Sequence, residues 1–483
     1  MTAAYHWLFV PLTLGLALVM ALMETLYVTT KDEFWKRTAQ FWIKIFAINF
    51  AVGIATGIIL EFEFGTNWSN YSWMVGDMFG APLAIEGILA FFMEATFFAV
   101  MFFGWDKVSK RFHLASTWLT GIGASISAYW ILVANGWMQN PVGTTFNPDT
   151  VRSEMASAQA FWEVISNPVA VSKFCHAITS GWVTGGVFVV GISCWYLMRG
   201  RHRRFARASI LMGSIVGIVG SFAVMLSGDS SGVHAAEFQP MKLAAAEGLE
   251  DGGRRAAFTI VPGVKIPGML SILATHDLDG YVPGINDILN GYTDNEGNVI
   301  PSVAEKMQMG RTALDALARY RELRDIDPEA AAQARAVLDA NVQYMGYGHL
   351  EKPEDVIPPV GVVFWAFRLM VGLGMLMLLV LLVAGWLAWK DRLDGKKWLY
   401  IVTLVCIPLV YICGQSGWVV AEVGRQPWTI QGLLPVNVAI SSLSAAAVKT
   451  TFFLFLAIFT LFLAIEIRIM VGAIKKGPEI PED

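Results

Sequence analysis

Long apolar runs dominate the chain, and polar residues are gathered in the segments that separate them. A membrane-spanning helix needs about 20 consecutive, mostly apolar residues to cross a hydrocarbon core roughly 30 Å thick. By this criterion the pattern predicts about nine spanning helices and therefore an all-α polytopic membrane protein. The predicted spans lie near residues 5–28, 39–63, 80–104, 113–135, 174–198, 206–227, 358–388, 399–421 and 447–474.

The segments between the spans differ in their content of Lys and Arg. Alternate segments are short and basic, and RGRHRR at 199–204 is the densest, whereas those at 64–79, 136–173 and 422–446 hold few basic residues, among them Arg152 and Arg425. Basic segments stay on the cytoplasmic side of a membrane. The pattern therefore predicts an outer N-terminus and a cytoplasmic C-terminus. The basic segments are 29–38, 105–112, 199–205, 389–398 and the tail with Lys475 and Lys476.

One connecting segment, 228–357, is far longer than the others, and the predicted orientation puts it on the outer side. It opens with polar residues and turn formers. Further along, apolar residues recur at helical spacing over 302–326, and Asp327–Pro328 is a typical start for a second helix. We therefore expect a helical hairpin in this segment. The chain then divides into 1–227 with six spans, the outer segment 228–357, and 358–483 with three spans and a cytoplasmic tail.

Composition agrees with a membrane protein and narrows its chemistry. The 483 residues are 55% hydrophobic and only 15% charged, and the mean hydropathy is +0.52, whereas soluble domains are about 25% charged. The formal net charge of −4 gives no reason to expect nucleic acid as a partner. The four cysteines lack CxxC spacing, so no disulfide framework, zinc site or iron–sulfur site is predicted. The N-terminal MTAAYHWLFV lacks a basic stretch and a cleavage site, so we expect the first apolar run to be retained as a span.

Two of the seven histidines, His6 and His176, fall inside apolar segments, close to the outer ends of their predicted helices. A histidine in this position either forms a hydrogen bond at the membrane interface or ligates a haem iron axially. Two stacked haems would need four histidines, so any haem here would require other ligands such as Met or Glu.

Charged residues inside the predicted spans are costly and therefore candidates for function. Glu86 and Glu94 lie eight residues apart in the third span. On a regular α-helix they would be about 12 Å apart along the axis and about 80° apart around it. They are candidate proton carriers, although they could instead bond neighbouring helices. Arg368 in the seventh span needs an anionic partner, either a carboxylate or a haem propionate. Met370, taken alone, is indistinguishable from a core methionine.

Several segments spread over nearly the whole chain resemble subunit I of the cytochrome bd-type quinol oxidases. This family includes cyanide-insensitive relatives, and its members have nine spans and a long outer loop. The segments that carry the resemblance are YHWLFVPLTLG at 5–15, EFEFGTNWS at 61–69, GDMFGAPLAIEG at 76–87, WILVANGWMQNP at 130–141, KFCHAITSGWVTG at 173–185, KLAAAEG at 242–248, FRLM at 367–370 and GWVVAEVGRQPW at 417–428.

The resemblance implies three haems near the outer face. His176 and Met370 would be the axial ligands of a low-spin haem b, with Arg368 close to it. His6 and Glu422 would serve two high-spin haems, and which residue holds which haem stays open. These two would be a haem b and the oxygen-binding haem d, or a further haem b as in cyanide-insensitive relatives.

The resemblance also assigns other residues to the reaction. Glu86 would lie beside the high-spin haems, and Glu94 would lie on a proton route from the cytoplasm with Ser127 as a candidate lining residue. Lys242 and Glu247 would take part in quinol oxidation, although by themselves they could be a solvated pair in a loop. The haem pocket and its electron path would be shaped by Trp418, Arg425 and Trp428.

The predicted function is therefore that of a terminal respiratory oxidase in the bacterial cytoplasmic membrane. Quinol would be oxidised at the outer face, O2 would be reduced to water with protons from the cytoplasm, and proton motive force would arise without pumping. The implied partners are a second membrane subunit and a small single-span subunit. The residues also allow two other classes of membrane protein, a cytochrome b membrane anchor and a proton-coupled transporter. The Met370 position argues against the anchor, and the lack of a visible repeat weakens the transporter.

Overall fold

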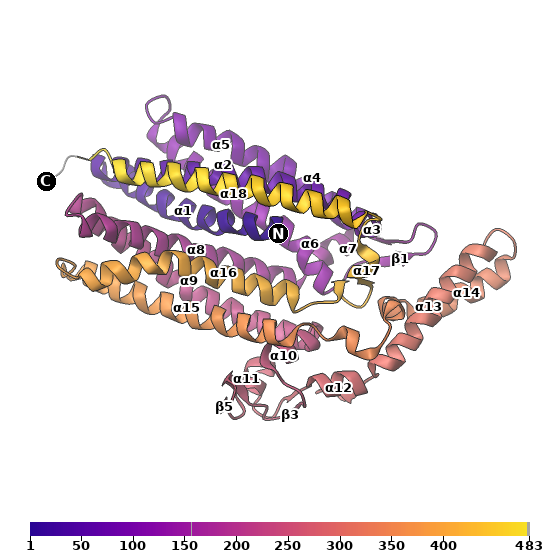
Figure 1. Cartoon of the computed structure of the whole chain (residues 1–483). Helices are drawn as coiled ribbons and strands as arrows, with labels where there is room; N and C mark the ends of the chain where they lie inside the picture. Colours follow the sequence, from indigo (N-terminus) through magenta and orange to yellow (C-terminus); the bar gives the residue numbers. More distant parts are fainter. Residues whose placement is uncertain (156, 481–483) are drawn as a thin grey trace.

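The computed structural model describes residues 1–155 and 157–480, and it is a bundle of long helices with a smaller structured segment at one end (Figure 1). Within these residues, nine helical segments are long and apolar enough to span a membrane. The predicted all-α polytopic architecture is thereby confirmed. The spans are α1 (Thr2–Thr30), α2 (Glu33–Asn67), α4 to α5 (Met78–Phe103), α6 (Lys110–Gln139), α7 to α8 (Ala158–Met198), α9 (Arg203–Phe238), η3 to α15 (Pro353–Trp389), α16 (Lys397–Val423) and α18 (Ala445–Lys476).

Helix α9 continues well beyond the predicted end of the sixth span. Residues 228–238, whose polar composition suggested a loop, belong to this helix. The hydroxyl of Ser227 donates to the carbonyl of Ala223 at 2.9 Å, and that of Ser231 donates to the carbonyl of Ser227 at 2.9 Å. These side chains bond back to their own helix and so do not compete with it. The outer segment therefore begins later than its composition indicated.

The third span is not a regular α-helix. It consists of α4 (Gly76–Ile85), a π-helical turn η1 (Glu86–Phe91) and α5 (Phe92–Phe103). The π-turn starts at Glu86 and ends before Glu94, so the angular offset expected for a regular helix does not apply to these two residues. Single π-turns inside α-helices occur frequently at functional sites.

The bundle is centred on α8 (Pro168–Met198). In the most apolar stretch of this span, 89% of the residues are buried. Small residues bring its backbone against α1: a Cβ atom added to Gly15 would collide with the carbonyl oxygen of Gly181. Close backbone approach at small residues is how helices pack in membranes, where lipid removes most of the hydrophobic drive for association. This contact fixes α1 against α8, and each of these two helices carries one of the predicted haem-ligating histidines.

The segment between α9 and α15 contains short elements and the predicted hairpin, which is confirmed as α13 (Val303–Leu323) and α14 (Pro328–Asn341). Ser302 caps α13, and Asp327 caps α14 by accepting a hydrogen bond from the Ala330 N–H. The other helices are α3 (Ser69–Met74), α7 (Ala158–Ile165), α10 (Pro240–Glu247), α11 (Met269–Thr275), α12 (Ile285–Asn290), η2 (Val342–His349), η3 (Pro353–Val356) and α17 (Val436–Ala439).

The strands of the described residues form five two-stranded antiparallel sheets, all in connecting segments. None of these sheets belongs to the bundle. The pairs are β1 (Thr145–Asn147) with β2 (Arg152–Glu154), β3 (Gly253–Arg254) with β6 (Tyr281–Val282), β4 (Phe258–Val261) with β5 (Val264–Ile266), β7 (Tyr292–Thr293) with β8 (Val299–Ile300), and β9 (Trp428–Ile430) with β10 (Leu434–Pro435).

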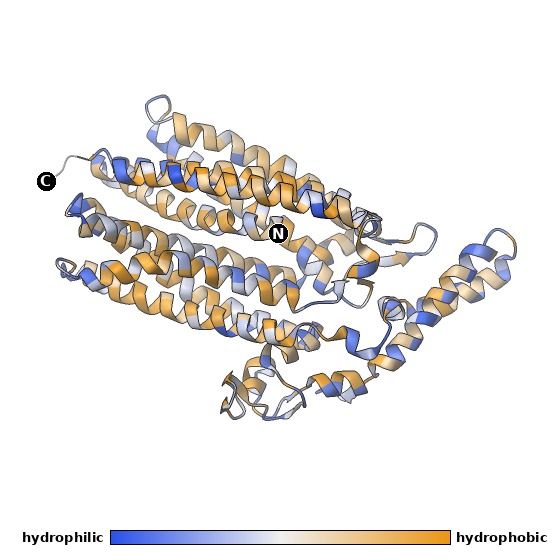
Figure 2. Cartoon of the chain, viewed as in Figure 1, coloured by the Kyte–Doolittle hydropathy of each residue, from blue (hydrophilic) through white to orange (hydrophobic). Residues whose placement is uncertain are grey.

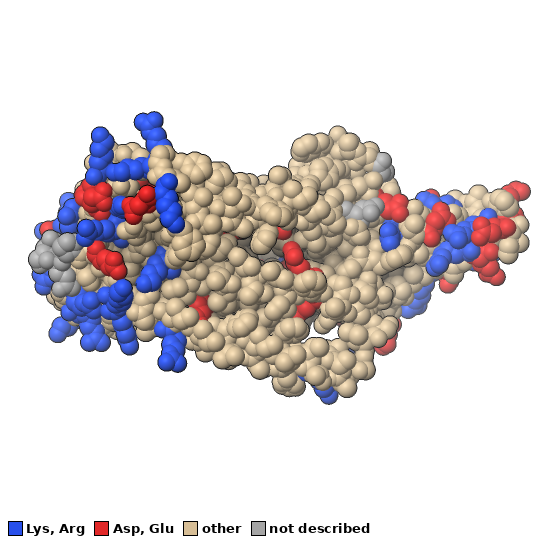
Figure 3. Space-filling model, turned by 90° about the horizontal axis from the view of Figure 1, so that it is seen from above, with Lys and Arg blue, Asp and Glu red and all other residues tan. Residues whose placement is uncertain are grey.

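Charge is distributed unevenly along the bundle. Apolar residues, orange in Figure 2, occur along the whole length of the bundle helices. Lys and Arg residues gather at the end of the bundle near the C-terminus (Figure 3). Ion pairs such as Arg204–Asp32, at 3.2 Å, join the basic segments to one another there. The α13–α14 hairpin at the opposite end carries both signs of charge. The basic segments of the sequence therefore share one end of the fold, and α10 to α14 lie at the other.

Candidate haem and quinol site

His6, on α1, is held by the second helix. Its Nδ1 lies 3.0 Å from the hydroxyl of Thr56 on α2. That hydroxyl itself donates to the carbonyl of Gly53 at 3.0 Å, so it accepts the hydrogen bond from the imidazole. The proton is then on Nδ1, and the lone pair of Nε2 is free to bind a metal.

His176, on α8, is held in the same way by α9. Its Nδ1 lies 3.4 Å from the hydroxyl of Ser227, which donates to the carbonyl of Ala223. The hydroxyl therefore accepts from Nδ1–H, and Nε2 is again left for a metal. A second group that fixes the tautomer and the ring orientation is the usual companion of a metal-binding histidine.

Met370, on α15, packs against Gly417 of α16. A Cβ atom at Gly417 would lie 2.8 Å from the Met370 sulfur, so the glycine makes room for that sulfur. Trp418 follows on α16 and is half-buried. Cys413, one turn earlier on α16, donates to the Met370 carbonyl at 3.3 Å. The position of the Met370 side chain is thus set by α16.

Glu422 lies at the end of α16 in a network that connects three spans. One carboxylate oxygen is 2.7 Å from Arg425, and the other accepts from the Asn135 amide on α6 at 3.1 Å. Lys173 on α8 donates to the same Asn135 side chain at 2.7 Å. Each carboxylate oxygen keeps a lone pair for a further partner. Arg425 also donates to the carbonyl of Thr429 at 2.7 Å.

Three buried polar atoms around this network have no hydrogen-bond partner within the part of the chain that the structure describes. They are the Tyr71 hydroxyl, Arg425 Nε and the Thr429 hydroxyl. Buried polar atoms are nearly always satisfied in native proteins, so each unsatisfied one needs an explanation. Two neutral hydroxyls and a guanidinium N–H would suit an anionic group such as a carboxylate.

These observations fit haem. Haem iron takes four nitrogens from the porphyrin and needs one or two protein ligands, which the free Nε2 atoms, the Met370 sulfur and Glu422 can supply. The propionates need hydrogen-bond donors, which the unpaired atoms near Arg425 offer. Among residues 1–155 and 157–480, no group of three or more His, Cys, Asp and Glu side chains is placed to hold a metal ion.

A shallow apolar hollow of about 370 Å³ is lined from α1, α15 and α16, for example by Leu8, Leu369 and Val419. His6, His176, Met370 and Glu422 are not among its lining residues.

Glu86, Glu94 and Ser127 lie where the third span meets α6. The Ser127 hydroxyl donates to a carboxylate oxygen of Glu86 at 2.6 Å. Glu94 is 8% exposed and packs on α6 at Gly123, where an added Cβ would be 3.3 Å from the Glu94 Cβ. The structure therefore brings all three predicted residues to one helix–helix contact.

Lys242 and Glu247 lie on α10, and the interpretation of a solvated loop pair is wrong. Both are buried, at 8% and 3% exposed, and they have different partners. Lys242 donates to the side chains of Gln139 and Gln239 at 2.8 and 2.6 Å. Burial lowers the pKa of Lys242 well below its ordinary value, and Lys173 nearby lowers it further.

Glu247 pairs with Arg368. The guanidinium of Arg368 lies 2.8 Å from the Glu247 carboxylate, donates to the carbonyl of Ala246, and stacks on the ring of Phe364 at 3.7 Å. Burial raises the pKa of Glu247 to about 7, although Arg368 acts to lower it. The anionic partner expected for Arg368 is therefore this carboxylate, which links α15 to α10. Trp428, on β9, is buried with its ring 4.7 Å from that of Tyr347.

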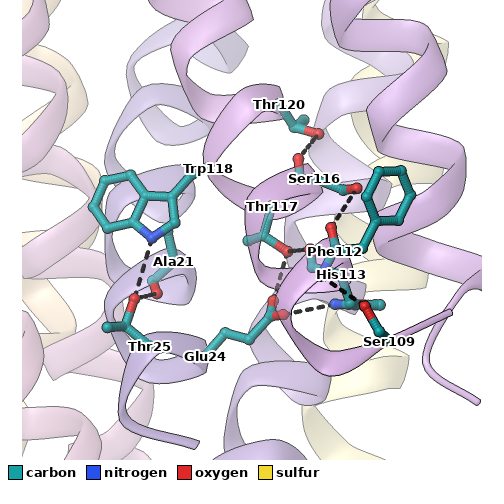
Figure 4. A network of polar contacts seen from close by, with 10 residues as sticks. All are labelled: Ala21, Glu24, Thr25, Ser109, Phe112, His113, Ser116, Thr117, Trp118 and Thr120. Atoms are coloured by element: carbon teal, nitrogen blue, oxygen red, sulfur yellow. Dashed lines mark hydrogen bonds and ion pairs between the residues drawn. The ribbon is translucent and has the colours of Figure 1, made fainter. Parts of the chain in front are cut away.

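The sequence did not single out two polar contacts. Lys173 and Asn135 join the Glu422 network, and the signal for them was a polar side chain at the outer end of each span. His113, the first residue of the predicted span 113–135, is 2% exposed and bonded to Glu24 (Figure 4). Its burial depends on the packing of α1 and α6, which the order of residues does not show.

The fold and the site define a polytopic helical membrane protein equipped to bind haem beside a buried lysine and a buried glutamate. Comparison with known proteins identifies the group: the chain belongs to the cytochrome bd terminal oxidase subunit I family, whose model matches residues 1–478. Membership confirms the resemblance noted in the sequence.

Individual relatives agree over almost the full length. The chain is 41% identical to cytochrome bd-II ubiquinol oxidase subunit 1 of Escherichia coli, over 99% of this chain and 95% of that protein. It is 35% identical to cytochrome bd ubiquinol oxidase subunit 1 of Bacillus subtilis, over 99% and 92%. The bd oxidase structure from Geobacillus thermodenitrificans superposes with a TM-score of 0.78 at 23% identity, covering 99% of this chain and 96% of that one, which shows that the fold is shared.

Proposed function

We propose that this chain is the haem- and quinol-binding subunit of a terminal oxidase that oxidises quinol and reduces O2 to water. The observation that carries the proposal is the state of the two membrane histidines. His6 and His176 each give the Nδ1 proton to a hydroxyl that is itself bonded to backbone, so both offer Nε2 to iron. The family to which the chain belongs supports the same reaction.

Each ligand keeps the role that the sequence resemblance gave it. His176 and Met370 would hold a low-spin haem b, and His6 and Glu422 would serve a high-spin haem b and a haem d or further haem b. When bound, the haems supply one-electron redox chemistry and O2 binding. Arg425 and Tyr71 would donate to propionates, and Trp418 and Trp428 would border the site.

The quinol would bind near α10, where Glu247 and Lys242 are buried. Glu247 can accept a proton from a quinol hydroxyl because its pKa, about 7, is close to the working pH. The Lys242 ammonium has three N–H donors and gives two of them to glutamine side chains, so the third can donate a hydrogen bond to a quinone oxygen. Arg368 holds Glu247 in place.

The orientation follows from the charge distribution. The end rich in Lys and Arg would face the cytoplasm, as positive residues do in membrane proteins. The α10 end would then be outside, so quinol protons would leave on that side. Glu94 and Glu86 would carry protons from the cytoplasm for water formation, and charge would cross the membrane without a pump. The complex would lie in a bacterial cytoplasmic membrane with a second membrane subunit and a small single-span subunit.

The test is purification of the complete complex, its absorption spectrum, and O2 consumption with ubiquinol and with menaquinol. His176→Ala should remove the low-spin haem signal. His276→Ala, an exposed histidine paired with Asp229 in the outer segment, should leave the spectrum unchanged. A wild-type complex without haem, or an intact low-spin signal in His176→Ala, would contradict the proposal.

A further inference from the structure

A glutamate and a histidine are buried together near the basic end of the bundle (Figure 4). Glu24, on α1, and His113, in the first turn of α6, have side chains only 1% and 2% exposed, with 2.7 Å between a carboxylate oxygen and Nδ1. The second carboxylate oxygen accepts from the Thr117 hydroxyl at 2.5 Å. His113 Nε2 is buried and has no hydrogen-bond partner among the residues that the structure describes.

A purely structural link between α1 and α6 does not require titratable groups. One residue further along α1, Thr25 accepts a hydrogen bond from the Trp118 indole at 3.1 Å, and this contact joins the same two helices with neutral side chains (Figure 4). A buried acid–base pair with one nitrogen unsatisfied carries a desolvation cost that the neutral contact avoids. Ionisable residues at membrane depth are functional candidates for this reason.

The pair lies at the start of a polar face of α6. Ser116, Thr117 and Thr120 are fully buried, and Thr120 donates to the carbonyl of Ser116 at 2.9 Å. Together with His113 and Ser127 they fall within an arc of about 100° on the helical wheel. The hydroxyls therefore share one side of this helix, with an interval of seven residues between Thr120 and Ser127.

The same side of α6 leads to the two glutamates of the third span. Glu94 packs on α6 at Gly123, about 4.5 Å along the axis from Thr120, and Ser127 donates to Glu86. The whole stretch from residue 113 to residue 127 rises about 21 Å. It thus runs from the basic end of the bundle to Glu94 and Glu86.

We propose that Glu24 and His113 form a proton-relay pair that takes up protons from the basic end and passes them along this face of α6 to Glu94. The inference rests on the proposed function, which gives Glu94 and Glu86 the transport of protons for O2 reduction. It adds the residues at which that transport begins.

The relay moves only protons. A proton binds His113 at Nε2 while the proton on Nδ1 passes to the Glu24 carboxylate, so an N–H bond forms, another breaks, and an O–H bond forms. The Glu24 carboxyl then gives its proton to the Thr117 oxygen as the Thr117 hydroxyl proton moves on along α6, and a rotation of the imidazole ring that turns the remaining N–H toward Glu24 restores the pair. A water between Thr120 and Glu94 would carry the proton over the last step. Electrons come from quinol, and the protons end in water.

The test uses the complete oxidase complex in liposomes. The fully reduced enzyme is mixed with O2, and the build-up of membrane potential and its slowing in D2O are followed. Glu24→Gln keeps the shape and the hydrogen bond from Thr117 but cannot bind the relayed proton. We expect it to slow the proton-uptake phase about tenfold or more, with normal haem content and normal haem reduction by quinol without O2. His113→Gln should slow the same phase.

Thr25→Val is the matched control, because it removes a hydrogen bond between the same two helices without removing a titratable group. It should behave as wild type. Glu24→Asp keeps a carboxyl group and should therefore take up protons faster than Glu24→Gln. This variant also tests the relay if the Glu24→Gln complex fails to assemble. Wild-type kinetics in both Glu24→Gln and His113→Gln would overturn the relay. A wild-type complex without haem or quinol oxidation would instead refute the proposed function.

Discussion

Replacement of Glu247 by glutamine tests the quinol site most directly. The carboxylate is 3% exposed and 2.8 Å from Arg368, and burial raises its pKa to about 7. The glutamine side chain would keep the shape and could still accept a hydrogen bond from the guanidinium, but it could not accept the quinol proton. A positioned general base contributes about 10²- to 10⁴-fold to a rate. Because each factor of ten corresponds to about 1.36 kcal/mol, the expected rise in the barrier is roughly 2.7–5.4 kcal/mol.

The pH dependence of the quinol oxidation rate shows which protonation state of Glu247 is active. A base must be unprotonated to act, so the rate should rise as the pH passes upward through the pKa of Glu247. With a pKa of about 7, about one-tenth of the carboxyl groups are ionised at pH 6 and about nine-tenths at pH 8, so the wild-type rate should increase about tenfold over this range. Glu247→Gln should remove this dependence together with the activity.

The assay is stopped-flow haem reduction by quinol without O2, which isolates this step from O2 chemistry. Glu250→Gln is the control, because Glu250 is exposed and lies three residues further along the chain. It should leave both the rate and the pH profile unchanged. If wild type has a flat profile between pH 6 and 8, or if Glu247→Gln keeps a rising one, Glu247 is not the proton acceptor.

Two further predictions concern the neighbours of this site. Arg368→Gln removes the cation that lowers the pKa of Glu247. The rising limb of the pH profile should therefore move to higher pH. The loss of one partner of a buried ion pair should also lower the stability of the protein by about 3–5 kcal/mol. An unshifted limb would contradict the pairing. Gly417→Ala puts a Cβ atom 2.8 Å from the Met370 sulfur; the flexible side chain can yield at a cost of about 1.5 kcal/mol or less, but the potential of the low-spin haem should shift in a redox titration. Gly372→Ala, with open space around it, should show no shift.

The sequence predicts the spans well because each is a local property. An apolar run of sufficient length forms a helix in a bilayer regardless of its neighbours. The exception is α9, whose residues 228–238 look like a loop by composition. Their hydroxyls bond back to the helix, as Ser231 does to the Ser227 carbonyl, and composition alone does not reveal this.

The contacts of the site depend on residues far apart in the chain. Glu247 and Arg368 are separated by 121 positions, and Lys242 and Gln139 by 103. The family resemblance points to Glu247, Arg368 and Lys242 as residues of the site. It does not say that Glu247 pairs with Arg368 or that Lys242 pairs with a glutamine. Those pairings follow from the packing of α10 against α15 and its closeness to the end of α6 at Gln139, which only the fold supplies.

The charge balance around Glu422 explains why these residues suit a haem with propionates. Three basic side chains, Lys173, Lys242 and Arg425, surround one carboxylate, Glu422. Burying unbalanced charge is costly. Burial and the neighbouring Lys173 lower the pKa of Lys242, and Arg425 Nε has no partner among the described residues. A propionate would supply the missing negative charge. Since a group that binds only the folded state stabilises it, haem binding and the assembly of this network should strengthen each other.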